Sequence, residues 1–320
     1  MNGGVVPADE DESGGLHPGR PFGKIYYGVC SWTDKTLIAG GTFYPADVKS
    51  AEARLRFYAS RFPLVEVDST YYAPPSVHNA RLWAERTPPG FLFNVKAHAL
   101  LTHHPADGRR LPLPVREMLP PAVREKKRTY LREVPAQAVA RIWSLHVDAL
   151  RPLADAGKLG CVLFQFPPWF RATRGAADYL RQLRDRLPYR IAVEFRGGGW
   201  MDEERRGRTL ALLEALGYAY VAVDEPQGFQ SSTPPLAAST APLAIVRFHG
   251  RNTESYEKKG ISVAERFRYF YAEEELREWV APIQALAETA DQVHVLMNNC
   301  HGDDGIRNAW QLARLLAAAS

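Results

Sequence analysis

The sequence predicts an α/β fold, a single (β/α)8 TIM-like barrel with a basic insert after the third strand. Short apolar segments typical of strands alternate with amphipathic segments typical of helices along the 320 residues. No linker or switch in this alternation separates two halves, as a pair of doubly wound domains would require. Polar residues follow the carboxyl ends of nearly all the expected strands, which is where the active sites of such barrels lie.

Each expected strand is a short run of aliphatic, aromatic and β-branched residues that ends near a polar residue, Pro or Gly. The runs are Ile25 to Cys30, Leu64 to Asp68, Phe91 to Lys96, Gly160 to Phe166, the run that begins at Ile191, Ala219 to Asp224, Ala244 to His249, and Val293 to Asn298. The expected helices are Ser50 to Arg61, Val77 to Arg86, Ala136 to Leu153, Gly175 to Leu187, Asp202 to Leu216, Glu273 to Glu288, and Gly305 to Ala319. A loop rich in Pro, Ser and Thr, Glu225 to Pro242, joins the sixth strand to the seventh.

Composition separates the chain into a tail and a domain. Residues 1–22 are rich in Gly, Asp, Glu and Pro and lack the apolar run of a signal peptide, which predicts a disordered tail before a barrel of residues 23–320. No apolar run is long enough to span a membrane. The three cysteines lack the close spacing of a disulfide framework or a zinc ribbon, and this favours a reducing cytoplasm. The oligomeric state has no signal in the sequence.

The segment Pro105 to Val134 is expected to be an inserted loop with some helix. It contains many prolines, and eight Arg or Lys against four Asp or Glu. The net charge of the whole chain is only +4, which is too mild to indicate nucleic-acid binding by itself.

The run from Ile191 to Trp200 shows how charge enters the barrel. Glu194 and Arg196 share one parity of the strand, Val193 and Phe195 share the other, and three glycines follow. Charge confined to the carboxyl end of a strand predicts that this end opens into a site. The polar residues expected at the same rim are Glu66, Asp68, Lys96, Gln165, Glu194, Arg196, Asp224, Arg247, His249, Arg251, Asn298 and Asn299, with Tyr71 and Trp200 just beyond strand ends.

Five of these motifs, in order, resemble one known family. They are Glu66-Val-Asp-Ser-Thr-Tyr-Tyr72, Gln165-Phe-Pro-Pro168, Val193-Glu-Phe-Arg196 with Trp200, Val246-Arg-Phe-His-Gly-Arg251 and Asn298-Asn299. The chain from about Tyr26 to its last helix is similar to domain of unknown function 72, the YecE-like family. The resemblance implies a TIM-barrel-like fold related in shape to endonuclease IV-like barrels. It implies no reaction, because that family has none established.

The rim residues predict recognition of an anion. Lys96, Arg196, Arg247 and Arg251 can neutralise a phosphate or carboxylate, while Gln165, Asn298 and Asn299 can bind its neutral part. Candidate acid-base groups are Glu194 and His249, with Asp224 and Lys96 beside them, and the remaining rim residues are expected to bind substrate. The leading hypothesis is a cytoplasmic, metal-independent hydrolase, lyase or isomerase without a cofactor, acting on an anionic, polyhydroxylated small molecule.

Three alternatives stay open. Glu66, Glu194 and Asp224 could pair with Lys96, Arg196 and Arg247 for structural reasons alone, because buried charges need partners. The basic segment with Tyr130 could bind or process nucleic acid. The barrel could also be an interaction scaffold. A retaining glycosidase of the common barrel kind is not supported, because Gln165 and His249 stand where its carboxylates are expected.

Cys30 and Cys300 test the closure of the barrel. They end the first and eighth expected strands, which become neighbours when an eight-stranded barrel closes. We expect the two residues to lie within roughly 12 Å of each other, because neighbouring strands are about 4.8 Å apart, and to remain reduced.

Overall fold

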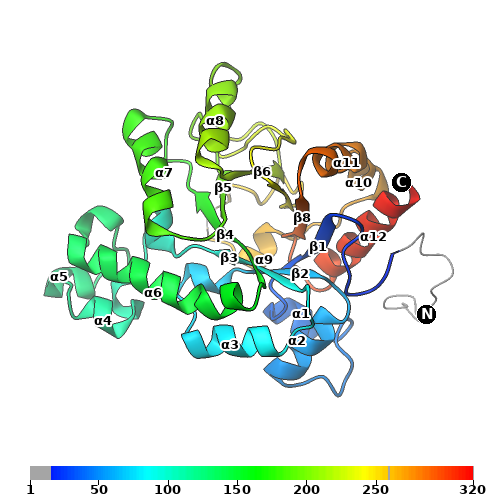
Figure 1. Cartoon of the computed structure of the whole chain (residues 1–320), viewed down its shortest axis with the longest axis horizontal. Helices are drawn as coiled ribbons and strands as arrows, with labels where there is room; N and C mark the ends of the chain where they lie inside the picture. The colour runs from blue at the N-terminus through cyan, green and yellow to red at the C-terminus, as the bar shows by residue number, and fades with distance from the viewer. Residues whose placement is uncertain (1–15, 259, 320) are drawn as a thin grey trace.

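The computed structural model of the chain describes residues 16–258 and 260–319, and these form a closed barrel of eight parallel strands in the order β1 to β8. The strands are β1 (Ile25–Cys30), β2 (Leu64–Val67), β3 (Leu92–Lys96), β4 (Leu159–Phe166), β5 (Ile191–Phe195), β6 (Ala219–Asp224), β7 (Leu243–Phe248) and β8 (Gln292–Met297). This confirms the predicted (β/α)8 TIM-like barrel, which Figure 1 shows with its helices around the strands.

Helices follow most of the strands. They are α1 (Lys35–Gly40), α2 (Ala51–Ala59), α3 (Val77–Glu85), α4 (Leu113–Arg116), α5 (Pro121–Arg124), α6 (Ala136–Asp155), α7 (Arg174–Arg186), α8 (Glu203–Leu216), α9 (Val263–Arg266), α10 (Glu273–Arg277), α11 (Val280–Thr289) and α12 (Asp304–Ala318). Residues 225–242, between β6 and β7, contain no helix, as their Pro, Ser and Thr content predicted. No helix in the described part of the chain is both long and apolar enough to cross a membrane.

The helices differ from the sequence prediction in three places, and the unpredicted short helix α9 is one of them. The short helix α1 was not predicted; Asp34 caps it by accepting hydrogen bonds from the backbone N–H groups of Thr36 and Leu37. The single helix expected over Glu273 to Glu288 is divided into α10 and α11. Pro282 has no N–H to donate to the carbonyl of Glu278, and it lies in the first turn of α11, where that loss is tolerated.

Side-chain parity divides the interior into layers. On β5, Val193 and Phe195 belong to the apolar layer between strands and helices, whereas Ala192 belongs to a cluster inside the barrel. The inner layer therefore holds every second residue of each strand.

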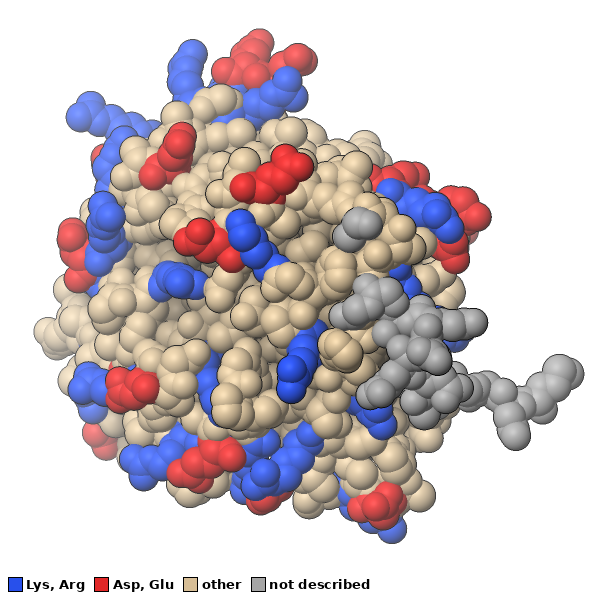
Figure 2. All heavy atoms as spheres, turned by 45° about the vertical axis from the view of Figure 1, so that its right-hand side comes forward, with Lys and Arg blue, Asp and Glu red and all other residues tan. Residues whose placement is uncertain are grey.

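Charges are interspersed on the face that Figure 2 shows, with both signs mixed.

Two residues of the predicted tail, Leu16 and Phe22, pack against the barrel. Residues 1–15 lie outside the described part of the chain. Leu16 is buried in the core, and Phe22 forms an antiparallel bridge with Ile25. Leu16 and Phe22 therefore hold the two ends of residues 16–22 against the barrel through their apolar side chains.

The segment Pro105 to Val134 folds as a compact unit beside α6, at the left of Figure 1. It contains α4 and α5 together with two short 3₁₀ turns, Gly108–Arg110 and Leu131–Glu133. Leu111, Val115 and Leu119 are buried. These apolar residues explain why a segment rich in proline and arginine folds onto the barrel. That it is an insert, absent from relatives, stays a prediction.

The two strands that close the barrel meet as expected. β1 pairs with β8 in parallel, with Tyr27 opposite Val295. The Cys300 thiol contacts the backbone carbonyl oxygen of Cys30, with Sγ 2.9 Å from that oxygen. The predicted proximity of Cys30 and Cys300 is confirmed, and both are free cysteines in the structure. Their redox state in the cell stays a prediction.

Candidate functional site

A buried ion cluster lies on the barrel axis near the carboxyl ends of the strands. Arg247 of β7 donates from Nη2 to Glu66 of β2 at 2.7 Å, and from Nη1 it makes a short hydrogen bond to Glu194 of β5. All three side chains have no exposed surface. Burial alone would raise the pKa of Glu194, but Arg247 and His249 lower it well below its ordinary value. Glu194 is therefore an ionised carboxylate whose charge Arg247 compensates.

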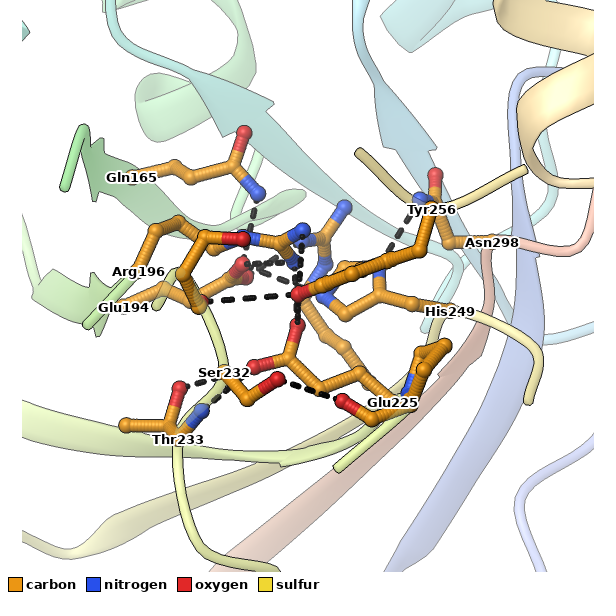
Figure 3. A network of polar contacts seen from close by, with 12 residues as sticks. Gln165, Glu194, Arg196, Glu225, Ser232, Thr233, His249, Tyr256 and Asn298 are labelled. Carbon is orange, nitrogen blue, oxygen red and sulfur yellow. Dashed lines mark hydrogen bonds and ion pairs between the residues drawn. The ribbon is translucent and has the colours of Figure 1, made fainter. Parts of the chain in front are cut away.

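His249 lies against this cluster. Its Nε2 is 3.1 Å from Glu194 Oε1, and its Nδ1 is 2.9 Å from the Asn298 amide nitrogen, as Figure 3 shows. With the Asn298 amide donating to Nδ1, the ring is neutral and Nε2–H donates to Glu194. Burial lowers the pKa of His249, although Glu194 acts in the opposite direction. Glu194 therefore orients His249 and fixes its tautomer.

A chain of hydrogen bonds leads from Glu194 through Gln165 to Lys96. Lys96 lies at the mouth of the barrel, the end at which the strands have their carboxyl termini. The Gln165 amide donates to Glu194 Oε1 at 2.5 Å, and Lys96 Nζ donates to Gln165 Oε1 at 3.0 Å. Lys96 also lies over the ring of Tyr71, 5.5 Å from its centroid. Among the described residues, no carboxylate forms an ion pair with Lys96 within 4.0 Å. Burial raises the pKa of Asp68, although the charge of Lys96 lowers it.

Arg196 joins the mouth to the loop after β6. Its Nη1 lies 2.7 Å from Glu225 Oε2, and its Nη2 donates to the Tyr256 hydroxyl at 3.1 Å. The Tyr256 hydroxyl in turn donates to Glu225 Oε2 at 2.6 Å. The other oxygen, Oε1, accepts hydrogen bonds from the backbone N–H and the hydroxyl of Thr233. These contacts are drawn in Figure 3. Sequence reasoning missed Glu225, although it lies one residue beyond β6 on the parity of Val221 and Val223, which face the barrel interior.

The three glycines after β5 let this loop approach. Gly197, Gly198 and Gly199 take positive φ angles of 65°, 71° and 78°, which favour glycine. A Cβ on Gly197 would lie 2.3 Å from the carbonyl oxygen of Gln230. The glycine run therefore permits the close contact between the end of β5 and the loop that holds Glu225.

Four predicted rim residues lie outside this cluster. The Asp224 carboxylate accepts three hydrogen bonds of 2.7 Å. Arg251 and the Trp279 indole donate to its Oδ2, and the Tyr271 hydroxyl donates to its Oδ1. Asn299 donates to the Tyr269 carbonyl and to Asn308. Trp200 is buried and stacks on Phe195, with ring centroids 4.6 Å apart. Asp224, Arg251, Asn299 and Trp200 therefore do not join Glu194, because they face away from the barrel axis.

Comparison with known proteins agrees with this architecture. Residues 26–320 match the family described as "Protein of unknown function DUF72". The chain belongs to this family. Among curated proteins, it is 31% identical over 297 residues to the UPF0759 protein YunF of Bacillus subtilis, which covers 91% of this chain and 94% of that protein.

Solved DUF72 structures share the fold. A DUF72 protein from Thermotoga maritima has 29% sequence identity and a TM-score of 0.70, with 91% of this chain and 98% of that chain covered. One from Enterococcus faecalis has 25% identity and a TM-score of 0.72, with 91% and 95% covered. These likenesses establish the family and its barrel and assign no reaction.

One titratable group of this DUF72 chain near the mouth, His104, is not among the site residues that the sequence predicts. The ring of His104 lies 5.3 Å from that of Tyr71 and 5.6 Å from that of Trp169. Burial lowers the pKa of His104 to about 3, and the charges of Lys96 and Arg196 contribute to this shift. The sequence carries no signal for this position, because His104 follows a left-handed turn residue, His103, whose conformation no periodicity reveals.

Within residues 16–258 and 260–319, no three His, Cys, Asp or Glu side chains are grouped to hold a metal ion. That the protein works without a metal or cofactor stays a prediction.

Proposed function

We propose that this DUF72 protein is an enzyme that binds an anionic, polyhydroxylated small molecule at the carboxyl-end mouth of the barrel and acts on it by acid–base chemistry. The observation that carries the proposal is Lys96. It is a half-buried ammonium group at the mouth, and it forms no ion pair within 4.0 Å with a carboxylate of the described residues. Since Lys96 has three N–H donors and gives one to Gln165, two can bind a phosphate or carboxylate oxygen.

The other cations are less available. Arg247 is enclosed by two carboxylates, and Arg196 is paired with Glu225. A substrate anion would therefore meet Lys96 first. This differs from the sequence-based expectation that Arg247 and Arg251 also bind the anion. The sequence also left open that rim carboxylates pair with rim arginines for structural reasons alone. The contacts of Glu66 and Glu194 with Arg247 fit that alternative.

We assign proton transfer to Asp68 and His249. Asp68 is half-buried, and burial raises its pKa. A raised pKa lies closer to neutral pH, where a general acid or base has to exchange protons. His249 offers Nδ1 when Asn298 turns its amide toward a substrate hydroxyl. Glu194 acts through His249 as a positioning residue, because a hydrogen-bonded carboxylate with a strongly lowered pKa is a poor base.

The test is a binding screen with a matched pair of variants. We expect ribose 5-phosphate and other sugar phosphates, used as probes in thermal-shift and calorimetric titrations, to reveal a ligand for the wild type. Lys96→Met should weaken its binding at least about ten-fold, the loss of one charge-assisted contact. Lys127→Met removes an exposed lysine of the 105–134 segment and should change nothing. Equal binding by all three proteins would remove Lys96 from the site and overturn the proposal.

A second candidate function is binding of single-stranded nucleic acid by the 105–134 segment. The observation that favours it is Tyr130, whose hydroxyl accepts a hydrogen bond from Arg128 and whose ring lies 5.1 Å from the Arg132 guanidinium. Cations beside an aromatic ring suit a stacked base and its phosphate. Binding to oligo-dT that weakens steeply with salt, and that Arg128→Ala with Arg132→Ala abolishes, would support this function. No binding at low salt would exclude it.

A further inference from the structure

Four rings form a row at the edge of the barrel mouth. They come from the segments that follow β2, β3 and β4, and they are Tyr72, Tyr71, His104 and Trp169. Neighbouring ring centroids are 5.1, 5.3 and 5.6 Å apart, each pair edge to face. The two end members are widely exposed, Tyr72 at 65% and Trp169 at 54%. Large exposed rings grouped in this way indicate a binding surface.

The row is held in place before any ligand binds. The Trp169 indole N–H donates to the His103 carbonyl at 3.1 Å. The Thr102 hydroxyl donates to the Ala99 carbonyl, so it accepts from Nδ1–H of His104 at 2.9 Å. Exposed rings with fixed orientations lose little conformational entropy when they bind, which favours stacking on them.

Lys96 lies next to the row, over the ring of Tyr71. We propose that the mouth binds a nucleotide-like ligand, with its planar base stacked on the exposed ring of Trp169 at one end of the row and its phosphate at Lys96. This inference rests on the proposed function, since it names the substrate class of the same site, and it adds a requirement for an uncharged planar ring beside the anion.

The environment of His104 indicates that the planar ring of the ligand is uncharged. Its lowered pKa, about 3, keeps the imidazole neutral near Lys96 and Arg196, so it adds no positive charge for the anion. With Nδ1–H bound to Thr102, its Nε2 is an acceptor, and no group among the described residues donates to it. An N–H of a base would suit this acceptor, and a second phosphate would not.

The preference for a base over a sugar comes from the shape of the surface. Stacking on an aromatic side chain favours a flat π-face and tolerates any base. Ribose is not planar and meets an aromatic ring through a few C–H groups, whereas a base meets it with its whole face. Adenosine 5′-monophosphate carries a base where ribose 5-phosphate carries its anomeric hydroxyl group, and the two share their phosphate, so they form a matched pair of probes.

The experiment measures both affinities by calorimetry for wild type, Trp169→Ala, Trp169→Leu and a control, Phe270→Ala. We expect the wild type to bind adenosine 5′-monophosphate roughly ten-fold or more tightly than ribose 5-phosphate. Trp169→Ala should weaken the nucleotide about ten-fold and leave ribose 5-phosphate unchanged. Phe270 is an exposed ring that lies beside Arg307 and outside the row, so its removal should affect neither probe.

The outcomes separate this inference from the proposed function. If both probes bind equally through Lys96 and Trp169→Ala alters neither, the anion site stands and the ring proposal is wrong. If neither probe binds in a Lys96-dependent way, both are wrong. Should Trp169→Ala unfold, Trp169→Leu gives the same readout, because it keeps most of the apolar volume and removes the aromatic face.

Discussion

The barrel holds two buried ion clusters that look alike in sequence and differ in what they face. The inner cluster, Glu66, Glu194 and Arg247, points to the barrel axis, and all of its side chains are fully buried. The outer cluster, centred on Asp224 and Arg251, lies outside the strands beside α10 and α11. Its arginine is partly exposed. The inner cluster is thus shielded from water on all sides, and the outer one is open at one end.

A shift of one residue along the chain decides which of the two clusters a charged side chain joins. Asp224 and Glu225 are neighbours in the chain. Asp224 binds Arg251 outside the barrel, and Glu225 binds Arg196 at its mouth. Because successive side chains of an extended segment point to opposite faces, residue type alone cannot assign either of them.

The largest expected effect comes from Arg247→Met. Methionine leaves Glu66 and Glu194 buried with no cation between them, and breaking a buried ion pair from one side costs about 3–5 kcal/mol. That is a large part of the free energy of unfolding of an ordinary domain, about 5–15 kcal/mol. Urea denaturation measures it.

The control for Arg247→Met removes all three charges together. The triple variant with Glu66→Gln and Glu194→Gln should recover most of the lost stability, since no unpaired charge remains. A loss below about 1 kcal/mol in the single variant would show that water reaches the inner cluster, and the contrast between the two clusters would not hold.

A smaller loss of stability is expected for Asp224→Asn in the outer cluster. Its carboxylate accepts from Arg251, Tyr271 and Trp279, and weakening such charge-assisted hydrogen bonds costs about 1.5–3 kcal/mol. Affinity for the phosphate probe should stay at the wild-type value, because Asp224 faces away from the mouth.

The matched variant, Lys96→Met, should show the reverse pattern. It loses probe binding while its stability changes by less than about 1 kcal/mol, because Lys96 forms no buried ion pair. If a folded Asp224→Asn protein lost probe binding, the outer cluster would have to be counted as part of the ligand site.

Acid should affect the inner cluster through Glu194. Its pKa in the folded protein is well below its ordinary value, so its contribution to stability is complete above the unfolded pKa, about 4.3, and is lost as pH falls toward the folded pKa. The stability gap between wild type and Glu194→Gln should therefore narrow below about pH 4. Urea midpoints measured from pH 7 to pH 3 test this. A gap that is constant with pH would mean that Glu194 titrates normally.

The fold could be predicted from sequence, and the site only in part. Alternation of strands and helices and the closeness of Cys30 and Cys300 follow from local pattern and closure, and the structure confirms both. The polar residues at strand ends were visible as well. Their grouping was not, because the assignment of Asp224 and Glu225 depends on the register of β6. His104 and Tyr256 could not be predicted, because they lie in irregular segments whose paths depend on tertiary contacts.

The smallest expected effect belongs to the exposed end of the outer cluster. Glu278 forms a 2.7 Å ion pair with Arg251, but its side chain is 58% exposed, so water and salt screen the pair. Glu278→Gln should change the free energy of unfolding by only about 0.2–1 kcal/mol, and by less in 1 M salt. Arg251 keeps its two-pronged contact with Asp224, which holds the guanidinium in place. Denaturation of both proteins at low and high salt measures the difference. A loss above about 2 kcal/mol that salt does not reduce would mean that Glu278 behaves like a buried partner, and the outer cluster would then be as closed as the inner one.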